Sequence, residues 1–338
     1  MALRVGMAGY GLAGRYFHAP LLKGCGLDLV AVLTSNPERV GHVKSDFPEA
    51  TVVSNIAELL SHNLDLVIVA SVNSVHVEQA IAALHAGVPT VVDKPMGRNL
   101  TETLEILKVS DDTGVPVTTF FNRLFDSDSL TIKRVIREKE IGNVFRIDSR
   151  FERYRPDLAA QSWREQSSAA EGGGLLLDLQ SHLVSTALDW FGPAELVSAS
   201  VRSIRGASDD DVVLVLRHES GVDSYLSASS IVGAPGPRIR MLGSKGALVI
   251  GELDPQEALL RAGKGPKNGK WEVSTKSEAR IIRGEEVSDI KVEDGNYAEF
   301  YSLVAGALVG KNSWPVSKEE IIAVATIIDR ARELNFRE

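Results

Sequence analysis

Three glycines placed directly after a short apolar run constrain the fold of this chain more than any other feature. Residues 3–8 form the run, and Gly9, Gly11 and Gly14 follow it with the spacing G-x-G-x-x-G. Where a strand passes into a helix, the first glycine allows a tight turn, the second lets a pyrophosphate approach the backbone, and the third packs the helix on the strand. The alternative is a plain strand-to-helix turn. Because a helical stretch follows the motif, we predict a dinucleotide-binding site.

The first 120 residues alternate short apolar runs with helical patterns. The runs are rich in Val, Leu and Ile and show little polar alternation, which is typical of parallel strands buried on both faces. They cover residues 3–8, 29–33, 66–70, 90–92 and 117–121. Helices are expected from Pro37 onwards and over residues 75–86. We therefore predict an α/β fold that begins with a doubly wound Rossmann domain over residues 1–121.

The second half of the chain has a different pattern, in which strands follow strands. Strand-like segments cover residues 144–153, 196–204, 212–217, 224–231 and 239–242, and helical patterns cover 127–139, 174–190 and the end of the chain from Lys318. Successive strands at this spacing indicate a mostly antiparallel sheet. We predict an α+β domain over residues 122–338 with a large open sheet. Its C-terminal helix could pack back on the first domain, and residues 252–292 show no clear pattern.

Composition excludes several classes of protein. The 37 basic and 45 acidic residues give a net charge of −8, whereas binding to a nucleic acid backbone needs an excess of Lys and Arg. Cys25 is the single cysteine, which excludes an intrachain disulfide and suggests a reducing compartment. The sequence has no apolar run of the ~18–20 residues that a membrane helix needs. Its seven histidines do not have the spacing of metal ligands. We expect a cytoplasmic protein with no metal site and no membrane partner.

The residues after the second predicted strand bear on the choice of cofactor. A chain that prefers NAD usually places Asp or Glu at this strand end, where the carboxylate binds the ribose hydroxyls. Here Thr34, Ser35 and Asn36 stand at the strand end and Arg39 follows. Hydroxyls, an amide and a guanidinium can bind a 2′-phosphate, so we expect NADP to be preferred over NAD. The alternative is that these are only the turn and cap residues of the next helix.

Lys94 follows the apolar run 90–92 and is itself followed by Pro95. A lysine at the carboxyl end of a parallel strand lies at the edge where such sheets bind ligands. On this tripeptide alone, an exposed turn lysine is the simpler explanation.

Asp178 and His182 are four residues apart in a leucine-rich helical segment that follows Gly172, Gly173 and Gly174. Positions four apart lie on one face of a helix. A carboxylate and an imidazole among so many leucines must be paired or must line a cavity. A buried structural pair is an equally good explanation.

Together these motifs resemble the Gfo/Idh/MocA oxidoreductases, the family of glucose–fructose oxidoreductase and inositol dehydrogenase. The resemblance rests on the glycine motif, on Asp93-Lys94-Pro95 and on the segment from Gly172 to His182. Further stretches are similar to the branch that contains NADP-dependent scyllo-inositol dehydrogenases, namely Phe121-Asn-Arg123, Asp126-Ser-Asp128, Arg153-Tyr-Arg-Pro156, Trp163-Arg-Glu165 and Gly295-Asn-Tyr297. The chain departs from the family at Asp93, where Glu is usual. It departs from the branch at Leu124-Phe125, where Arg-Trp is common, and at Asn36, where a basic residue is common.

The resemblance implies an NAD(P)-dependent dehydrogenase that reversibly oxidises a secondary alcohol of a cyclic polyol or sugar. Lys94, Asp178 and His182 match the catalytic positions of the family. His182 would remove the hydroxyl proton, Lys94 would stabilise the developing alkoxide, and Asp178 would orient the hydroxyl and His182. The resemblance also implies a homo-oligomer, a dimer or tetramer, formed through the C-terminal sheet. Two other functions stay open: a non-catalytic sensor that binds a dinucleotide, and a glycosidase that uses a tightly bound nicotinamide transiently.

Further residues are predicted to line the site. For the cofactor these are Leu12, Ala13, Ser71, Asn73 and His76, and for the substrate they are Asn122, Arg123, Tyr154, Arg155 and Trp163. The aromatic and basic residues among them suit a polyhydroxylated ligand, although surface ion pairs would explain them equally well.

Overall fold

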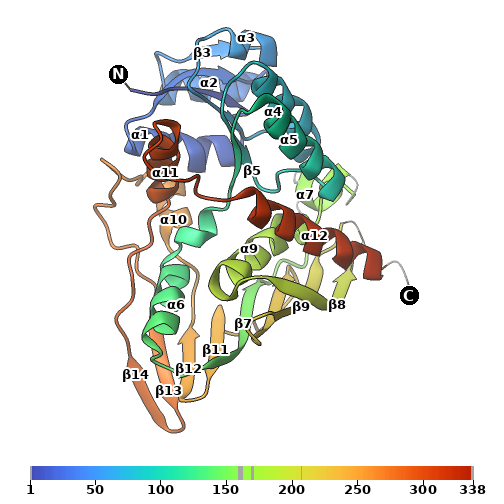
Figure 1. Ribbon diagram of the computed structural model, residues 1–338, viewed down its shortest axis with the longest axis vertical. Helices are drawn as coiled ribbons and strands as arrows, with labels where there is room; N and C mark the ends of the chain where they lie inside the picture. Colours follow the sequence, from blue (N-terminus) through green and yellow to red (C-terminus); the bar gives the residue numbers. More distant parts are fainter. Residues whose placement is uncertain (1, 159–162, 169–170, 207, 336–338) are drawn as a thin grey trace. The chain divides into compact units, whose positions relative to one another are not determined.

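The chain divides into two compact units. The computed structural model describes residues 2–158, 163–168, 171–206 and 208–335 (Figure 1). The first unit comprises Met1–Asn122, Gln256–Ser274 and Asn296–Ile322, and the second comprises Arg123–Pro255, Thr275–Gly295 and Ala323–Glu338. The main break at Asn122 lies one residue from the expected domain boundary. Two later segments also belong to the first unit, and of these only the start of the C-terminal helix, at Lys318, had been considered from the sequence.

The first unit contains the predicted Rossmann sheet. Its six strands are β1 (Arg4–Ala8), β2 (Asp28–Leu33), β3 (Thr51–Val53), β4 (Leu66–Val69), β5 (Thr90–Asp93) and β6 (Val117–Phe120). They pair in the order β3-β2-β1-β4-β5-β6, and every pair is parallel. Strand β3 was not predicted, because three residues at the edge of a sheet are too few to show a period. Ala8, Val69 and Asp93 end their strands at the same edge, which places the loops that follow them together.

Several helices of the first unit begin at an asparagine that caps them. They are η1 (Gly14–His18), α1 (Ala19–Gly24), α2 (Pro37–Asp46), α3 (Ile56–Leu60), η2 (Asn73–Val75), α4 (His76–His85), α5 (Leu100–Thr113), α10 (Gln256–Arg261) and α11 (Ala298–Leu308). The side chains of Asn36, Asn55 and Asn99 each accept the backbone N–H three residues further along, so they cap α2, α3 and α5. Helix α5 ends at Gly114, which has a left-handed φ of 68°.

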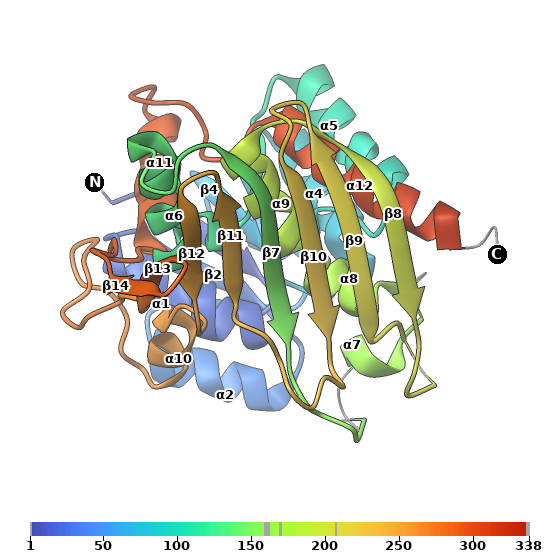
Figure 2. The same ribbon diagram turned by 90° about the horizontal axis from the view of Figure 1, so that it is seen from below.

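The second unit contains the predicted open sheet, which is mostly antiparallel (Figure 2). Its eight strands are β7 (Val144–Glu152), β8 (Ala194–Arg202), β9 (Asp211–His218), β10 (Asp223–Ser229), β11 (Ile239–Gly243), β12 (Gly246–Ile250), β13 (Ala279–Arg283) and β14 (Glu286–Asp289). Their order is β14-β13-β12-β11-β7-β10-β9-β8, and β7 with β10 is the one parallel pair among them.

Helices cover one face of the second sheet. They include α6 (Ser127–Glu138), α7 (Trp163–Gln166), α8 (Leu175–Asp178) and α9 (Gln180–Phe191), while α12 (Lys318–Asn335) begins in the first unit and continues in the second. Ile132 of α6 and Trp190 of α9 pack with the inward side chains of the strands, such as Ile147 and Met241. The predicted helix over residues 174–190 is interrupted. Leu179, with φ −107° and ψ −35°, separates α8 from α9.

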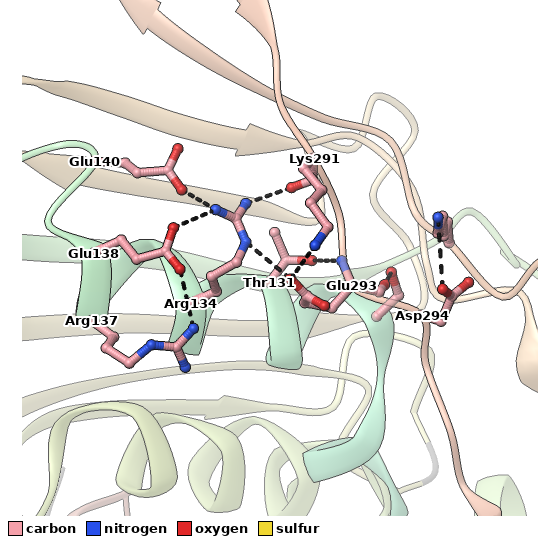
Figure 3. Close-up of polar contacts among 10 residues, drawn as sticks. Thr131, Arg134, Arg137, Glu138, Glu140, Lys291, Glu293 and Asp294 are labelled. Atoms are coloured by element: carbon pink, nitrogen blue, oxygen red, sulfur yellow. Dashed lines mark hydrogen bonds and ion pairs between the residues drawn. The ribbon is translucent and has the colours of Figure 1, made fainter.

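The segment without a clear sequence pattern is held by a buried arginine. Residues 252–292 contain α10, β13 and β14. Arg134 of α6 lies among three carboxylates, with ion pairs to Glu138 and Glu293 at 3.1 Å each and a further pair to Glu140 (Figure 3). Thr131 accepts the backbone N–H of Glu293 at 3.0 Å. These contacts fix the segment that follows β14 against α6, and long-range contacts of this kind leave no periodic signal in the sequence.

Candidate active site

The first and third glycines of the motif are required by backbone packing. Gly9 has φ 100°, and a Cβ atom there would lie 2.6 Å from the carbonyl oxygen of Ala70. A Cβ atom on Gly14 would overlap the carbonyl oxygen of Gly9. Side chains at either position would therefore separate β1 from β4 or from the helix that follows the motif. These two glycines thus allow the tight turn from strand to helix that the motif predicts.

Gly11 has a different environment, in which no described backbone atom occupies the place of a side chain. The nearest described atoms to its Cβ position are those of the Arg39 guanidinium, at 3.7–3.8 Å. The exposed Arg39 side chain thus reaches across from α2 to the glycine loop. Space at the second glycine, next to a cation and the start of a helix, suits an anionic group such as a phosphate. The residues present therefore fit a bound dinucleotide.

The end of β2 carries hydroxyl and amide groups. Thr34 is buried and its N–H donates to the carbonyl of Val53, whereas Ser35 and Asn36 are exposed. Asn36 uses its side-chain oxygen to cap α2, where it accepts the N–H of Arg39 at 3.1 Å. The cap interpretation is therefore correct for the Asn36 oxygen. This cap does not use the Ser35 hydroxyl or the Arg39 guanidinium, and both could contact a ligand.

The loop after β4 holds three residues that were predicted to contact the cofactor. Ser71 donates its hydroxyl proton to Gln79 at 2.7 Å, and Asn73 is buried at the start of η2. The His76 ring is 1% exposed, with Nδ1 3.0 Å from the carbonyl oxygen of Pro95 and Nε2 3.3 Å from that of Ser71. Burial lowers the pKa of His76. The ring thus bridges the ends of β4 and β5, and contact between these residues and a cofactor stays a prediction.

Lys94 begins the turn after β5. The Lys94–Pro95 peptide bond is cis, and the Lys94 side chain is half-buried. The Asp93 carboxylate accepts the backbone N–H of Lys94 at 2.9 Å. Burial alone would raise the pKa of Asp93, but the neighbouring His18, Lys94 and His76 hold it below its ordinary value. Lys94 thus stands beside an ionised carboxylate at the edge of the sheet that also carries the glycine loop.

In the second unit, the glycines before Asp178 make room for a carboxylate. A Cβ atom on Gly174 would overlap Oδ1 of Asp209. Asp209 accepts the N–H of Leu176 on its carboxylate at 2.7 Å and the N–H of Leu175 on its carbonyl at 3.0 Å. Burial raises the pKa of Asp209. This residue therefore caps α8, the short helix that ends at Asp178, and the sequence analysis did not single it out.

His182 lies in the first turn of α9 and is buried. The rings of Phe151 and His182 lie in an edge-type arrangement, with their centroids 6.3 Å apart. The guanidinium carbon of Arg238 stands 4.1 Å from the centre of the Phe151 ring, and its Nη1 donates to Ser149 at 2.7 Å. Phe151 and Arg238 thus support the predicted base, and neither belongs to a motif that the sequence could reveal.

Asp178 has basic neighbours. Burial lowers the pKa of Arg153, the guanidinium of Arg155 lowers it further, and the carboxylates of Asp178 and Glu165 raise it. The side chain of Arg205 holds the segment around Arg155 through the carbonyl of that residue at 3.0 Å. The Asp178 carboxylate thus interacts with the charge of Arg153, and a carboxylate oxygen can accept a hydrogen bond from a hydroxyl.

The predicted substrate residues differ in exposure. Asn122 is buried in the first unit, and Arg123 is buried in the second with an ion pair to Asp126 at 3.4 Å. Tyr154 is 64% exposed, and Arg155 is exposed. Trp163 begins α7, but its side chain lies outside the described part of the structure. A role of these residues in substrate binding stays a prediction.

The residues predicted to form the site are divided between the two units. The glycine motif, Arg39 and Lys94 belong to the first unit, and Asp178 and His182 belong to the second. Across the described residues, no group of three His, Cys, Asp or Glu side chains is placed to hold a metal ion. In the same residues, no helix is long and apolar enough to cross a membrane.

Comparison with known proteins places this architecture in a family. Residues 3–121 match the oxidoreductase family with an NAD-binding Rossmann fold, and residues 129–249 match the GFO/IDH/MocA C-terminal domain. The chain is 33% identical to the scyllo-inositol 2-dehydrogenase (NADP(+)) IolW of Bacillus subtilis, over 98% of this chain and 93% of that protein. It is also 33% identical to the uncharacterized oxidoreductase YdgJ of Escherichia coli, over 97% and 94% of the two chains.

A solved structure shows the same fold along the whole length. The structure of yvaA from Bacillus subtilis superposes with a TM-score of 0.88 at 33% identity, over 99% of this chain and 97% of that one. Both halves of the site therefore lie in regions that this fold shares. The chain belongs to the Gfo/Idh/MocA family of oxidoreductases, with an NAD-binding Rossmann domain at its N-terminus.

Proposed function

We propose that this protein is an NADP-preferring dehydrogenase that reversibly oxidises a secondary alcohol of a cyclic polyol or sugar. The observation that carries the proposal is the environment of Gly11, where the Arg39 guanidinium faces the open side of the glycine loop. Lys94 at the same sheet edge, and Asp178 with His182 in the second unit, supply the remaining groups. The likeness to a protein named as an NADP-dependent scyllo-inositol dehydrogenase supports the substrate class.

The cofactor would be held by the glycine loop and the end of β2. The backbone N–H groups of Leu12 and Ala13 lie where the helix after the loop begins, and they would bind the pyrophosphate. Ser35 and Arg39 would bind the 2′-phosphate, and the stretch Leu33–Asn36 has no carboxylate to repel it. When bound, the nicotinamide ring supplies the hydride acceptor.

The protein side chains would handle the proton and the charge. His182, as a neutral imidazole, would take the hydroxyl proton of the substrate, because imidazole titrates near neutral pH. The Lys94 ammonium would stabilise the alkoxide as it forms. An ionised carboxylate can only accept hydrogen bonds, so Asp178 would orient the reacting hydroxyl and His182 by accepting from them. In the reverse direction the same groups return the proton to the carbonyl oxygen.

The proposal is tested by a substrate panel. Inositols, aldoses and sugar acids are offered with NADP or NAD, and the absorbance of the reduced cofactor is followed. We expect net reduction with at least one cyclic polyol or aldose. Complete inactivity with intact cofactor binding would contradict the proposal and favour a sensor. Release of a sugar without net cofactor turnover would favour a glycosidase.

We also propose that the protein is a cytoplasmic homo-oligomer that assembles through the second sheet. The helices of that unit lie on one face of the sheet, and in Figure 2 the strands β7 to β12 face the viewer without a helix over them. Tyr225 on β10 and Val197 on β8 are 39% and 54% exposed. Burial of such residues is a common driving force for association.

The oligomer is tested with a charge on this sheet. Tyr225→Asp should dissociate the assembly, because an unpaired carboxylate is costly to bury. Light scattering after size exclusion reports the mass. The matched control is Leu104→Asp on α5, a residue 43% exposed in the first unit, and this change should leave the mass unchanged. A monomeric wild-type protein would contradict the proposal.

A further inference from the structure

A cluster of buried polar side chains lies beside Lys94, and the proposed reaction does not use it. Its members are His18 from the end of η1, Asp93 from the end of β5 and Tyr301 from α11. His18 and Tyr301 are both 0% exposed. Three segments far apart in the sequence therefore place titratable groups together in the interior of the first unit. Burial of such groups is costly unless they bond to one another.

One oxygen atom of Asp93 joins this cluster to Lys94. Oδ1 accepts the backbone N–H of Lys94 at 2.9 Å, and the same Oδ1 lies 3.8 Å from Nε2 of His18. On the other side of the imidazole, Nδ1 of His18 lies 2.5 Å from Oη of Tyr301. Tyr301, His18, Asp93 and Lys94 thus follow one another in space, with a hydrogen bond at each end of the row and a 3.8 Å contact between His18 and Asp93 in its middle.

The chemistry of these atoms selects one tautomer of His18. A carboxylate oxygen is only an acceptor, so Nε2 must carry the hydrogen for its contact with Asp93 to be attractive. Nδ1 is then an acceptor, and Tyr301 donates its hydroxyl proton to it. Burial raises the pKa of Tyr301 well above its ordinary value, which keeps that proton in place. Tyr301 is therefore the group that can fix which nitrogen of His18 is protonated.

Aromatic rings hold the cluster in position. The Phe120 ring lies 4.4 Å from the His18 ring between centroids and stacks on Tyr301 at 5.8 Å. The titratable groups that act on Asp93 are His18, Lys94 and His76, and those that act on Tyr301 are Asp93 and Cys25. His18 itself ends a π-helical stretch that begins at Gly14 of the glycine motif. Single π-helical turns of this kind often occur at functional sites.

We propose that Tyr301 and His18 are positioning residues for Lys94: the Tyr301 hydroxyl fixes the Nε2–H tautomer of His18, which holds the Asp93 carboxylate and thereby the turn that carries Lys94. The inference rests on the proposed function for the role of Lys94 in turnover. The cluster itself lies within the first unit, so its protonation can be measured without a substrate.

The first experiment reads the tautomer in the wild-type protein. Two-bond ¹H–¹⁵N correlation spectra of the histidine rings are recorded at pH 7.5, and His18 is assigned by the loss of its signals in His18→Gln. We expect a protonated Nε2 and an unprotonated Nδ1. The opposite tautomer, or a doubly protonated ring, would overturn the proposal whether or not a substrate is known.

The second experiment removes the hydroxyl that fixes the tautomer. In Tyr301→Phe, His18 should populate the Nδ1–H form, and kcat should fall about 10- to 100-fold, the range expected when a reacting group is slightly misplaced. KM and the cofactor Kd should change less than about twofold, because Tyr301 does not form part of either proposed binding surface. Unchanged kcat together with an unchanged tautomer would overturn the proposal.

A matched control separates this effect from a general loss of stability. Thr118 is also fully buried in the first unit and donates its hydroxyl proton to the carbonyl of Val316 at 2.9 Å. Thr118→Val removes that bond and should leave the His18 spectrum and kcat unchanged.

Two substitutions of Asp93 test the proposal even where the Tyr301→Phe variant does not fold. Asp93→Asn keeps an oxygen for the Lys94 N–H and for His18 Nε2–H, whereas Asp93→Ala removes it. Asp93→Asn should therefore retain more kcat than Asp93→Ala, and equal losses would overturn the proposal.

Discussion

In the proposed reaction Lys94 and His182 each act through a single atom, so their replacement should affect turnover far more than folding. We expect Lys94→Met and His182→Ala each to lower kcat by about 10²–10⁴, the range for a lost acid–base group. Circular dichroism should show the wild-type fold. Lys108→Met, which removes an exposed lysine of α5 that pairs with Asp112, is the control and should keep full activity. Near wild-type turnover in either variant would exclude the proposed role of that residue.

In the proposed function, the preference for NADP depends on the Arg39 guanidinium and the Ser35 hydroxyl. A charge-assisted hydrogen bond contributes about 1.5–3 kcal/mol, which corresponds to a tenfold to hundredfold ratio of kcat/KM between the two cofactors. Arg39→Gln should reduce that ratio towards one. Ser35→Asp should reverse it, because a carboxylate repels the 2′-phosphate. The measurement is kcat/KM for NADP and NAD with one substrate, and a clear preference of the wild-type protein for NAD would contradict the assignment.

The sequence could predict only those site residues that belong to a local motif. Gly9, Gly11 and Gly14 follow a strand, and the structure shows the packing that requires two of them. By contrast, Asp209 lies far along the chain from the α8 segment that it caps, and Tyr301 lies far from the turn that it helps to hold. The roles of these two residues depend on contacts that form only in the folded chain, and no spacing in the sequence marks such contacts.

At the scale of elements, α8 depends on Gly174. Gly174 has φ 90° and ψ 163°, a conformation that costs a residue with a Cβ about 1–3 kcal/mol. A Cβ atom there would also collide with the Asp209 carboxylate that caps α8. We expect Gly174→Ala to lower the free energy of unfolding by more than this backbone cost and to lower kcat, because α8 carries Asp178. Urea denaturation and steady-state kinetics test both effects.

Gly192 supplies the control for this change. It ends α9 with φ 81° and ψ −164°, nearly the same backbone conformation, and no other described atom lies within 4 Å of its Cβ position. Gly192→Ala should therefore show the backbone cost alone and leave kcat unchanged. Equal effects of the two substitutions would exclude a contribution from the contact with Asp209.

The elements that the sequence missed are those that tertiary contacts create. A continuous helix was expected over the leucine-rich residues 174–190, but the helix is interrupted at Leu179, between α8 and α9. Strand β14 has four residues, of which Val287 is the only large apolar one, and it pairs with β13 through its backbone. The strands of the first unit, which alternate with helices along the chain, were predictable. Burial on both faces of the sheet selects Val, Leu and Ile throughout each strand.

For the whole molecule, two buried histidines should make stability depend on pH. Burial lowers the pKa of His218 and of His76, so the unfolded chain binds their protons first as the pH falls. Stability should therefore be complete above about pH 6.5 and decrease below it, by at most about 1.4 kcal/mol per pH unit for each histidine. Urea denaturation at pH 7.5 and 5.5 measures the loss.

The contribution of His218 is isolated by substitution. Its ring nitrogens lie 2.8 Å from the carbonyl oxygen of Gly192 and 2.9 Å from the hydroxyl of Ser224. His218→Gln should lower stability at both pH values but reduce the difference between them. His85→Gln, at an exposed position on α4, should leave that difference unchanged. An undiminished difference in His218→Gln would contradict the assignment.

The discontinuous first unit has a consequence for synthesis on the ribosome. Phe120 packs edge-on against Phe300 at 4.8 Å, and His18 bonds to Tyr301, so both depend on α11. Residues up to Asn122 emerge early, whereas the unit ends at Ile322, 200 residues later. At 5–20 residues per second that interval is about 10–40 s. During it the nascent Rossmann sheet has an uncovered aromatic surface, and a chaperone that binds apolar surfaces would find its target there.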